Sequence, residues 1–380
     1  MRRVGPSPVF GIPPATLTVR GRLLPKCLER GERASPSVQS LLKTPLRIFL
    51  SLAVAGGLLT ALMLWVGVNL DEVVAALSLL TPAEYLLAVC IHAGIYSLRA
   101  LRFRLLVPPA ARPPFGRTLT VSAAHNLASY VLPAKTGEAS FILYLKRFAG
   151  VSGARGLASL LVSRLLDLAV MCSGISLACF YLATRSEAVS NERMQGLMPV
   201  AILLLACTLV FSFLGARGHL LVIFIEKIAR FSRLDRIAFG RKVLARFTEV
   251  EDALRGAGGE GRLFFAAVLS VPLWALVFGF YFVLGCGFGL PDSTSYAEVV
   301  FGSSATVIFN LLPVNGVAGF GTQELGWTFG FEFLGVDRKL ALASGISTHL
   351  VQLFNVCLFG VLGHLVMGWL KPTAASDEES

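Results

Sequence analysis

Long apolar runs separated by short polar segments dominate the chain, a pattern typical of a protein that crosses a membrane several times. A helix needs about 20 predominantly apolar residues to cross a hydrocarbon core about 30 Å thick. We therefore expect six spanning helices, at residues 46–68, 84–106, 156–183, 197–215, 263–288 and 340–369. Near the end of the second span, Arg99, Arg102 and Arg104 are expected to snorkel to the inner surface.

Two further segments, residues 118–148 and 299–334, are largely apolar but contain Pro, Gly and an acidic residue. Pro and Gly break a helix, and lipid does not tolerate broken backbone that is exposed to it. We therefore expect each segment to form two short helices that enter the membrane and return to the same side. The alternative for the second segment is a crossing, which would place the C-terminal tail outside.

The two halves of the chain carry similar residues in the same order. At an offset of 185 positions, eight of the 21 residues from Phe148 to Leu168 are identical to their counterparts. Each half then contains three spans and one hairpin, and a unit with an odd number of spans that is copied in tandem must insert upside down. We therefore predict an all-α polytopic membrane protein made of two inverted repeats, each with three spanning helices and one re-entrant helical hairpin.

Composition and charge fit a membrane protein and suggest its orientation. Of the 380 residues, 55% are hydrophobic and 15% charged, whereas soluble domains have about 25% charged residues. Basic residues mark cytoplasmic segments, and the polar segment that holds Asp71 and Glu72 is expected to be an external loop. The expected organisation is a basic Pro-rich cytoplasmic tail (1–45), repeat 1 (46–185), repeat 2 (186–370) with an amphipathic cytoplasmic connector (216–262), and an acidic cytoplasmic tail (371–380).

Arg164 and Asp167 lie near the middle of the third span, on one face of the helix. An arginine at the bilayer centre costs about 2.5–3.5 kcal/mol on insertion scales, so it usually has a structural or functional reason to be there. We expect these residues to pair, either as an ion pair that joins helices or as an anion-attracting site whose charge Asp167 moderates. His349 and Gln352 occupy the corresponding positions in the second half.

Glu138 and Glu324 each follow a glycine-bearing turn and precede an apolar helical stretch. They either complement the positive end of a helix dipole or bind a cation, a proton or a headgroup amine. Lys135 precedes Glu138, and the N-termini of the hairpin helices offer N–H groups to a phosphate. Asn126 and Asn310 are further candidate binding residues, unless they only tie the broken helices together.

The sequence contains no Walker motif, zinc-ligand spacing, Asp-rich pair or Ser/His/Asp arrangement in a suitable context. We therefore expect no metal, no cofactor and no catalytic residue, and a transporter rather than an enzyme. Membrane lipids are the expected partners. Lipid-biosynthesis enzymes and a second copy of the chain are further candidates, whereas nucleic acid is not, because the basic tail is more typical of a segment lying near anionic lipid.

The order and spacing of these residues resemble the lysylphosphatidylglycerol synthase transmembrane family, also called flippase-like integral membrane proteins. The resemblance covers about residues 46–370 and rests on Leu132-Pro133 before Gly137-Glu138, on Arg164 and Asp167, and on the segment from Leu312-Pro313 through Gly319 and Gly321 to Glu324. It implies a two-fold membrane domain with re-entrant helices that moves lipids between leaflets. In bifunctional relatives this domain flips an aminoacylated phospholipid made by an attached soluble synthase, which we do not expect here. Other members are associated with hopanoid or glycolipid pathways. His349 stands where the family often has an arginine, which argues against a symmetric two-arginine site and introduces a pH-sensitive group.

Together these features predict a lipid flippase or transporter of the cytoplasmic (inner) membrane. Arg164, Lys135 and helix N-termini would attract a phospholipid or lipid-linked headgroup between the hairpins, while Glu138 and Glu324 tune the charge and couple a proton. Two alternatives stay open. One is a membrane enzyme of lipid or glycolipid biosynthesis, with either glutamate as the base, and the other is an accessory subunit of such a pathway that acts through the connector.

Overall fold

The structure is a computed structural model that describes residues 57, 59–131, 137–184, 196–216, 223, 227, 261–311 and 317–370. These residues form helices and no strand. The expected N-terminal and C-terminal tails, most of the first span and nearly all of the connector lie outside the described residues.

Four helices are long and apolar enough to cross a membrane: α3 (Pro82–Leu106), α6 (Gly153–Thr184), α12 (Arg262–Gly287) and α15 (Arg338–Trp369). They confirm the predicted spans at 84–106, 156–183, 263–288 and 340–369 as helices of membrane length. Residues 59–66 and α2 (Leu70–Leu79), which meet at 93°, would add a fifth span if counted together. The apolar helix α8 (Leu197–Ala216) packs along α6, so the predicted span at 197–215 is a helix.

The segment after the first span was expected to be a loop and is instead helical, whereas its external position stays a prediction. The Asn69 side chain accepts a hydrogen bond from the Glu72 backbone N–H, and the Glu72 carboxylate accepts one from the Asn69 backbone N–H. This capping box satisfies the first amides of α2 and allows a helix to begin directly after the left-handed Gly67. Thr81 and Glu84 begin α3 in the same way.

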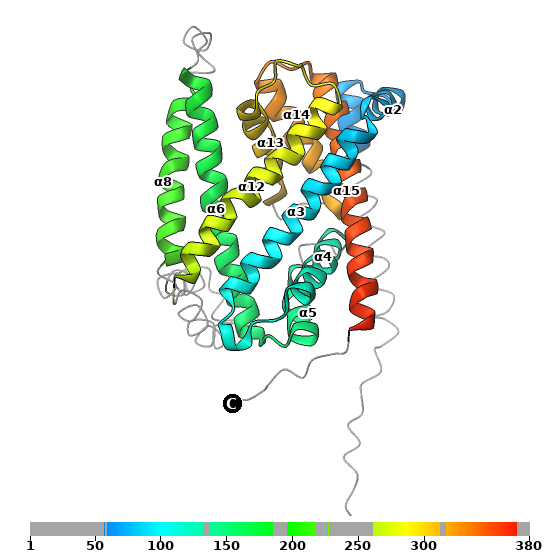
Figure 1. The fold of residues 1–380 in the computed structure, drawn as a ribbon. Coiled ribbons are helices and arrows are strands. Elements are labelled where there is room, and N and C mark those ends of the chain that lie inside the picture. The colour runs from blue at the N-terminus through cyan, green and yellow to red at the C-terminus, as the bar shows by residue number, and fades with distance from the viewer. Residues whose placement is uncertain are drawn as a thin grey trace, which may run out of the picture. The chain divides into compact units, whose positions relative to one another are not determined.

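Both segments predicted as hairpins consist of paired short helices. The first hairpin contains α4 (Phe115–Val131), α5 (Glu138–Tyr144) and a π-helical turn (Leu145–Ala149); the second contains α13 (Tyr296–Leu311), a 3-10 turn (Val317–Gly319) and α14 (Thr322–Phe333). In each hairpin the two helices pack together. Figure 1 shows α4 and α5 near one end of the long helices and α13 and α14 near the other.

The order and lengths of the helices recur along the chain. α6 and α15 each have 32 residues and begin 185 positions apart, and α3 and α12 have 25 and 26 residues. α3 packs against α12, α4 packs against α15, and α13 packs against α6. Each hairpin therefore contacts the long helix of the other half, and the two halves form one interlocked unit.

Many large apolar side chains point away from the protein. Ile202 and Leu203 of α8, Phe264 of α12 and Leu365 of α15 are all exposed. Exposed apolar faces of this extent suit contact with lipid rather than water. Between α6 and α8 the contacts include small polar groups, since the Ser176 hydroxyl donates to the Ala201 carbonyl oxygen at 2.7 Å, as is common between helices in membranes.

Candidate functional site

A buried ion pair joins three of the long helices. The guanidinium of Arg102, on α3, binds the Asp167 carboxylate of α6 through two hydrogen bonds of 2.6 and 3.1 Å. The same carboxylate accepts a hydrogen bond from the Trp274 indole of α12 at 3.0 Å, and Arg102 also donates to the Ser270 hydroxyl at 2.9 Å. A two-pronged arginine–carboxylate contact fixes both groups in orientation as well as in distance.

Two further arginines complete what we call the arginine cluster: Arg99, Arg102, Arg164 and Asp167. Arg164 lies 3.6 Å from Asp167, which confirms the predicted pairing within α6, and its side chain is 49% exposed. Arg99 is partly buried and interacts electrostatically with Asp167, Arg164 and Arg102. Among these four side chains, three guanidinium charges face one carboxylate charge.

The structure corrects the prediction that Arg102 snorkels to the inner surface. Its side chain is only 1% exposed and is turned into the protein. A carboxylate on the neighbouring helix provides a partner inside the membrane, so the guanidinium does not need water to be solvated. Arg104 donates to the Pro113 carbonyl oxygen at 2.8 Å and reaches the segment before α4.

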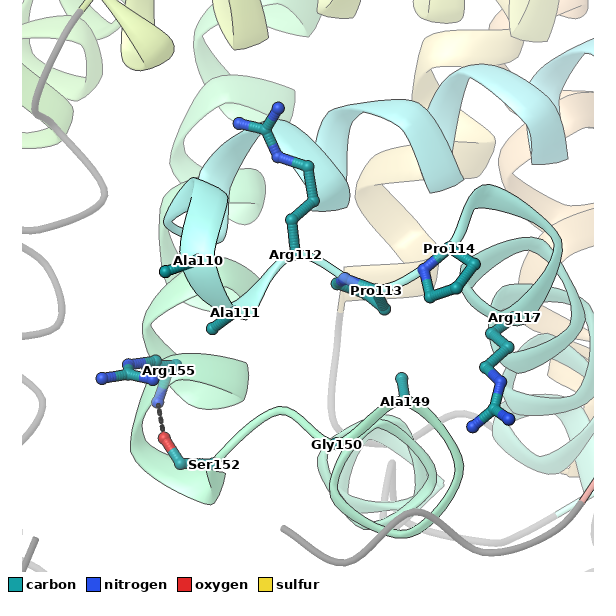
Figure 2. Close-up of a pocket in the computed structure, with 10 residues that line it drawn as sticks. All are labelled: Ala110, Ala111, Arg112, Pro113, Pro114, Arg117, Ala149, Gly150, Ser152 and Arg155. Atoms are coloured by element: carbon teal, nitrogen blue, oxygen red, sulfur yellow. Dashed lines mark hydrogen bonds between the residues drawn. The ribbon is translucent and has the colours of Figure 1, made fainter. Parts of the chain in front are cut away.

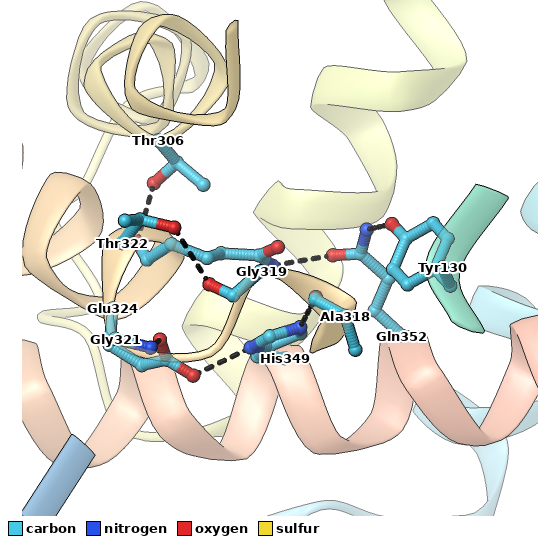
Figure 3. Close-up of polar contacts among 10 residues, drawn as sticks. Tyr130, Thr306, Ala318, Gly319, Gly321, Thr322, Glu324, His349 and Gln352 are labelled. Carbon is cyan, nitrogen blue, oxygen red and sulfur yellow. Dashed lines mark hydrogen bonds and ion pairs between the residues drawn. The ribbon is translucent and has the colours of Figure 1, made fainter. Parts of the chain in front are cut away.

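The second polar cluster, which we call the histidine–glutamate cluster, lies where the second hairpin meets α15 (Figure 3). Glu324 and His349 are completely buried, and the His349 Nδ1 lies 2.6 Å from a Glu324 carboxylate oxygen. The other ring nitrogen lies 3.0 Å from the Ala318 carbonyl oxygen. The second carboxylate oxygen of Glu324 accepts a hydrogen bond of 2.7 Å from the Gly321 backbone N–H.

An amide chain extends this cluster towards the first hairpin. The Gln323 side-chain amide donates to the Gln352 carbonyl oxygen at 2.8 Å, and the Gln352 amide donates to the Tyr130 hydroxyl of α4. Tyr130 in turn interacts electrostatically with Arg99. The hydrogen bonds therefore connect α14, α15 and α4, and the electrostatic influence of Arg99 extends to the Tyr130 end of the chain.

Of the four other predicted site residues, only Asn126 has a side chain that the structure describes. Asn126 donates to the Tyr96 hydroxyl at 2.7 Å, next to Arg99. Lys135 lies outside the described residues. Glu138 begins α5 and Asn310 lies in α13, but the contacts of their side chains are outside what the structure describes.

A separate pocket of about 590 Å³ lies beyond the C-terminal end of α3, among the segments that join α3 to α4 and the π-helical turn to α6. Arg112, Arg117 and Arg155 line it, and Figure 2 shows their guanidinium groups pointing in three different directions. None of the predicted site residues lines this pocket. Divergent guanidinium groups do not make a single anion site, so the two buried clusters remain the better candidates.

Sequence reasoning identified Arg164, Asp167, Glu324, His349 and Gln352 but missed their partners. Arg102 was assigned to the membrane surface, and Gln323, Tyr130 and Trp274 carried no signal of their own. The sequence held one indication for Arg102. The residue lies within a predicted span, and a charged side chain inside a membrane needs a partner of opposite charge. The pairing itself depends on how α3, α6 and α12 pack.

Comparison with known proteins identifies the family of the chain. No curated protein and no solved structure matches it. Residues 48–360 match the family described as the lysylphosphatidylglycerol synthase TM region. The matched segment covers all the described long helices except the last turns of α15, and with them both polar clusters. The chain therefore belongs to the lysylphosphatidylglycerol synthase transmembrane-region family, whose members are membrane proteins related to lipid handling.

Proposed function

We propose that the protein is a flippase that moves an anionic phospholipid or lipid-linked headgroup between the two leaflets of the membrane. The observation that carries this proposal is the arginine cluster, in which three guanidinium groups share one carboxylate among membrane-length helices. Arginine side chains inside a bilayer are costly, and they commonly mark the path of a substrate. A headgroup phosphate would bind to guanidinium groups while its acyl chains stay in lipid.

The recurrence of the helices supports an inverted-repeat architecture for this transporter. The two hairpins lie towards opposite ends of the long helices, and each packs on the long helix of the other half (Figure 1). In transporters with inverted repeats, a site between two such halves opens to one side of the membrane and then to the other. The partly exposed Arg164 lies on α6, which packs against α13 of the second hairpin.

Basic residues are more frequent at one end of the long helices than at the other, and this supports a cytoplasmic position for that end. It is the end that carries the 106–115 and 149–153 segments. Basic residues at this end are Arg104, Arg112, Arg117, Lys146, Arg147 and Arg155. Acidic residues predominate at the other end, with Asp71, Glu72, Glu84, Asp292, Glu298, Glu332 and Asp337 against Arg338 and Lys339. The excess of Lys and Arg on the cytoplasmic side of membrane proteins gives this orientation.

Lipid translocation in reconstituted vesicles tests the proposal. The purified chain is placed in vesicles that contain fluorescent phosphatidylglycerol, and a membrane-impermeant quencher reports the fraction in the outer leaflet. Arg164→Ala and Arg99→Ala are expected to reduce translocation to the rate of protein-free vesicles while the helical content stays unchanged. Both arginine side chains are partly exposed, so their removal is expected to affect lipid binding more than folding.

Arg338→Ala is the matched control, because Arg338 is also an ion-paired arginine but lies exposed beside Glu332. It should translocate lipid like the unmodified protein. Full translocation by Arg164→Ala and Arg99→Ala would remove the arginine cluster from the transport site. A covalently altered lipid recovered from the vesicles would instead favour the membrane-enzyme alternative.

A further inference from the structure

We infer that Glu324 and His349 form a proton-binding site, and that binding and release of this proton is coupled to lipid movement. The inference rests on the proposed function for its coupling step but not for the site itself. It begins from the two contacts of the His349 ring, which is completely buried in α15. Nδ1 lies 2.6 Å from the Glu324 carboxylate, and Nε2 lies 3.0 Å from the Ala318 carbonyl oxygen (Figure 3).

Counting donors shows that this arrangement holds one dissociable proton. A neutral imidazole has only one N–H, whereas an ionised carboxylate and a carbonyl oxygen only accept hydrogen bonds. Both contacts are satisfied in two states. In one, an imidazolium donates from Nδ1 to the Glu324 carboxylate and from Nε2 to the Ala318 carbonyl oxygen. In the other, a neutral imidazole donates from Nε2 and accepts at Nδ1 from a Glu324 carboxylic acid. In either state one proton lies between Nδ1 and Glu324, and the pair is electrically neutral.

Loss of that proton would leave one N–H for two acceptors, so a ring lone pair would face either the Glu324 carboxylate or the Ala318 carbonyl oxygen. The pair would also carry a negative charge, and Glu324 has no other charged partner among the described residues. In the first case Glu324 would keep only the hydrogen bond from the Gly321 backbone N–H, in a site with no exposure to solvent. A buried and unpaired negative charge is strongly unfavourable. The deprotonated pair is therefore expected to rearrange, with the loss of at least one of the two His349 contacts.

The other described histidines do not require such a proton. His364 donates from Nδ1 to the Gly360 carbonyl oxygen at 2.8 Å, and its Nε2 lies 3.2 Å from the Tyr144 hydroxyl, which has a hydrogen to donate. His125 lies 3.0 Å from the Ser140 hydroxyl, which can accept from it. Neutral rings satisfy both sites, and the Nδ1 of the buried His92 has no hydrogen-bond partner, so among the described histidines only the pair with Glu324 needs an extra proton.

The proton is linked to the conformation of the second hairpin. Ala318, whose carbonyl oxygen faces His349, has a φ of 59°, in the left-handed region that residues with a side chain rarely adopt. Gly319 and Gly321 follow with φ of 83° and 86°. A contact from the protonated pair holds this turn closed against α15, and its loss removes the support for an unfavourable backbone conformation.

The surroundings of the pair are otherwise poor in charge. On α4 and α12, the titratable groups Tyr130 and Tyr281 interact with Gln352. From α13, the neighbouring polar group is the Thr306 hydroxyl. Arg99 reaches this region only through Tyr130. No described cation other than His349 is thus available to neutralise Glu324.

Spectroscopy on the full chain in lipid nanodiscs tests the site without reference to transport. Nitrogen-15 NMR of the histidine rings and infrared spectroscopy of the carboxyl groups together detect an imidazolium or a buried carboxylic acid near neutral pH. We expect one such signal, which disappears in His349→Gln and in Glu324→Gln but persists in the matched control His364→Gln. Absence of both the imidazolium and the acid from the unmodified protein would overturn the inference.

Coupling is tested in the vesicle assay with and without a pH gradient. We expect the gradient to change the rate of lipid translocation by the unmodified protein. Glu324→Gln removes the carboxylate that exchanges the proton, so whatever translocation it retains should have the same rate with and without the gradient. A gradient-independent rate in the unmodified protein would overturn the coupling. If the unmodified protein moved no lipid at all, both the proposed function and the coupling would be rejected. The spectroscopic experiment would still show whether Glu324 and His349 bind a proton.

Discussion

The carboxylate of Asp167 contacts groups from three directions while only 13% of its side chain is exposed. It accepts from Arg102 of α3 and Trp274 of α12, and it lies beside Arg164 of its own helix. Breaking a buried ion pair leaves one charge without a partner, which is far more costly than breaking an exposed one. At the residue scale, Asp167 therefore both neutralises the arginine cluster and holds three helices in register.

Asp167→Asn is expected to destabilise the fold by about 3–5 kcal/mol, because it leaves the guanidinium of Arg102 buried without a counter-charge. The measurement is thermal or denaturant unfolding of the detergent-solubilised protein. Glu332→Gln is the control, since Glu332 forms a similar two-pronged contact with Arg338 at the surface and should change stability little. Equal effects of the two substitutions would show that burial does not determine the importance of Asp167.

The sequence predicted contacts between charged residues that are close together along one helix, but not contacts between residues that are far apart in the chain. Arg164 and Asp167 lie three positions apart on one helix, so their pairing followed from helical geometry. The partnership of Arg102 with Asp167 joins positions that are 65 residues apart and depends on the packing of α3 on α6. His349 and Glu324 were each recognised as intramembrane polar groups, but their mutual contact required the second hairpin to fold against α15.

At the element scale, close backbone contact between α13 and α14 holds the second hairpin together. A Cβ atom added at Gly326 would lie 2.7 Å from the Thr306 Cα, and one added at Gly330 would collide with the Gly302 carbonyl oxygen. These contacts run in opposite chain directions, so α13 and α14 are antiparallel. Small residues at such positions let helices approach closely in a membrane.

Gly326→Ala should therefore destabilise the hairpin by about 1–3 kcal/mol, the usual cost of forcing extra volume into a packed contact. Gly279→Ala is the control, because Gly279 lies within α12 and a Cβ atom there meets nothing within 4 Å. Alanine favours a helix more than glycine does, so the control should be neutral or slightly stabilising. The unfolding temperatures of the two variants in detergent should thus shift in opposite directions or differ clearly in size.

Apolar periodicity and length were enough to predict α3, α6, α12 and α15, because a membrane imposes a minimum length on any helix that crosses it. The paired helices of both hairpins were predicted from Pro and Gly inside apolar sequence. The helix α2 was not, since its acidic residues were interpreted as marks of an external loop rather than as a capping box. The inverted orientation of the repeats remains a prediction, supported by helix lengths that match across the two halves.

At the scale of the whole molecule, the orientation of each hairpin decides whether the two halves are inverted. A re-entrant hairpin begins and ends on one side of the membrane, whereas a crossing segment begins on one side and ends on the other. The first hairpin is flanked by Gly116 and Ser152, and the second by Ser293 and Lys339. All four positions are at least partly exposed, which makes them suitable for chemical labelling.

Single cysteines at these four positions, in a chain without its seven native cysteines, should therefore give a defined labelling pattern. We expect Gly116→Cys and Ser152→Cys to react only with reagent on the cytoplasmic side, because basic residues surround both, and Ser293→Cys and Lys339→Cys only with reagent outside. Labelling of Ser293→Cys and Lys339→Cys from opposite sides would instead mean that the second hairpin crosses the membrane. In that case α6 and α15 would cross the membrane in the same direction, the two halves would not be inverted copies, and alternating access between inverted halves would lose its structural basis.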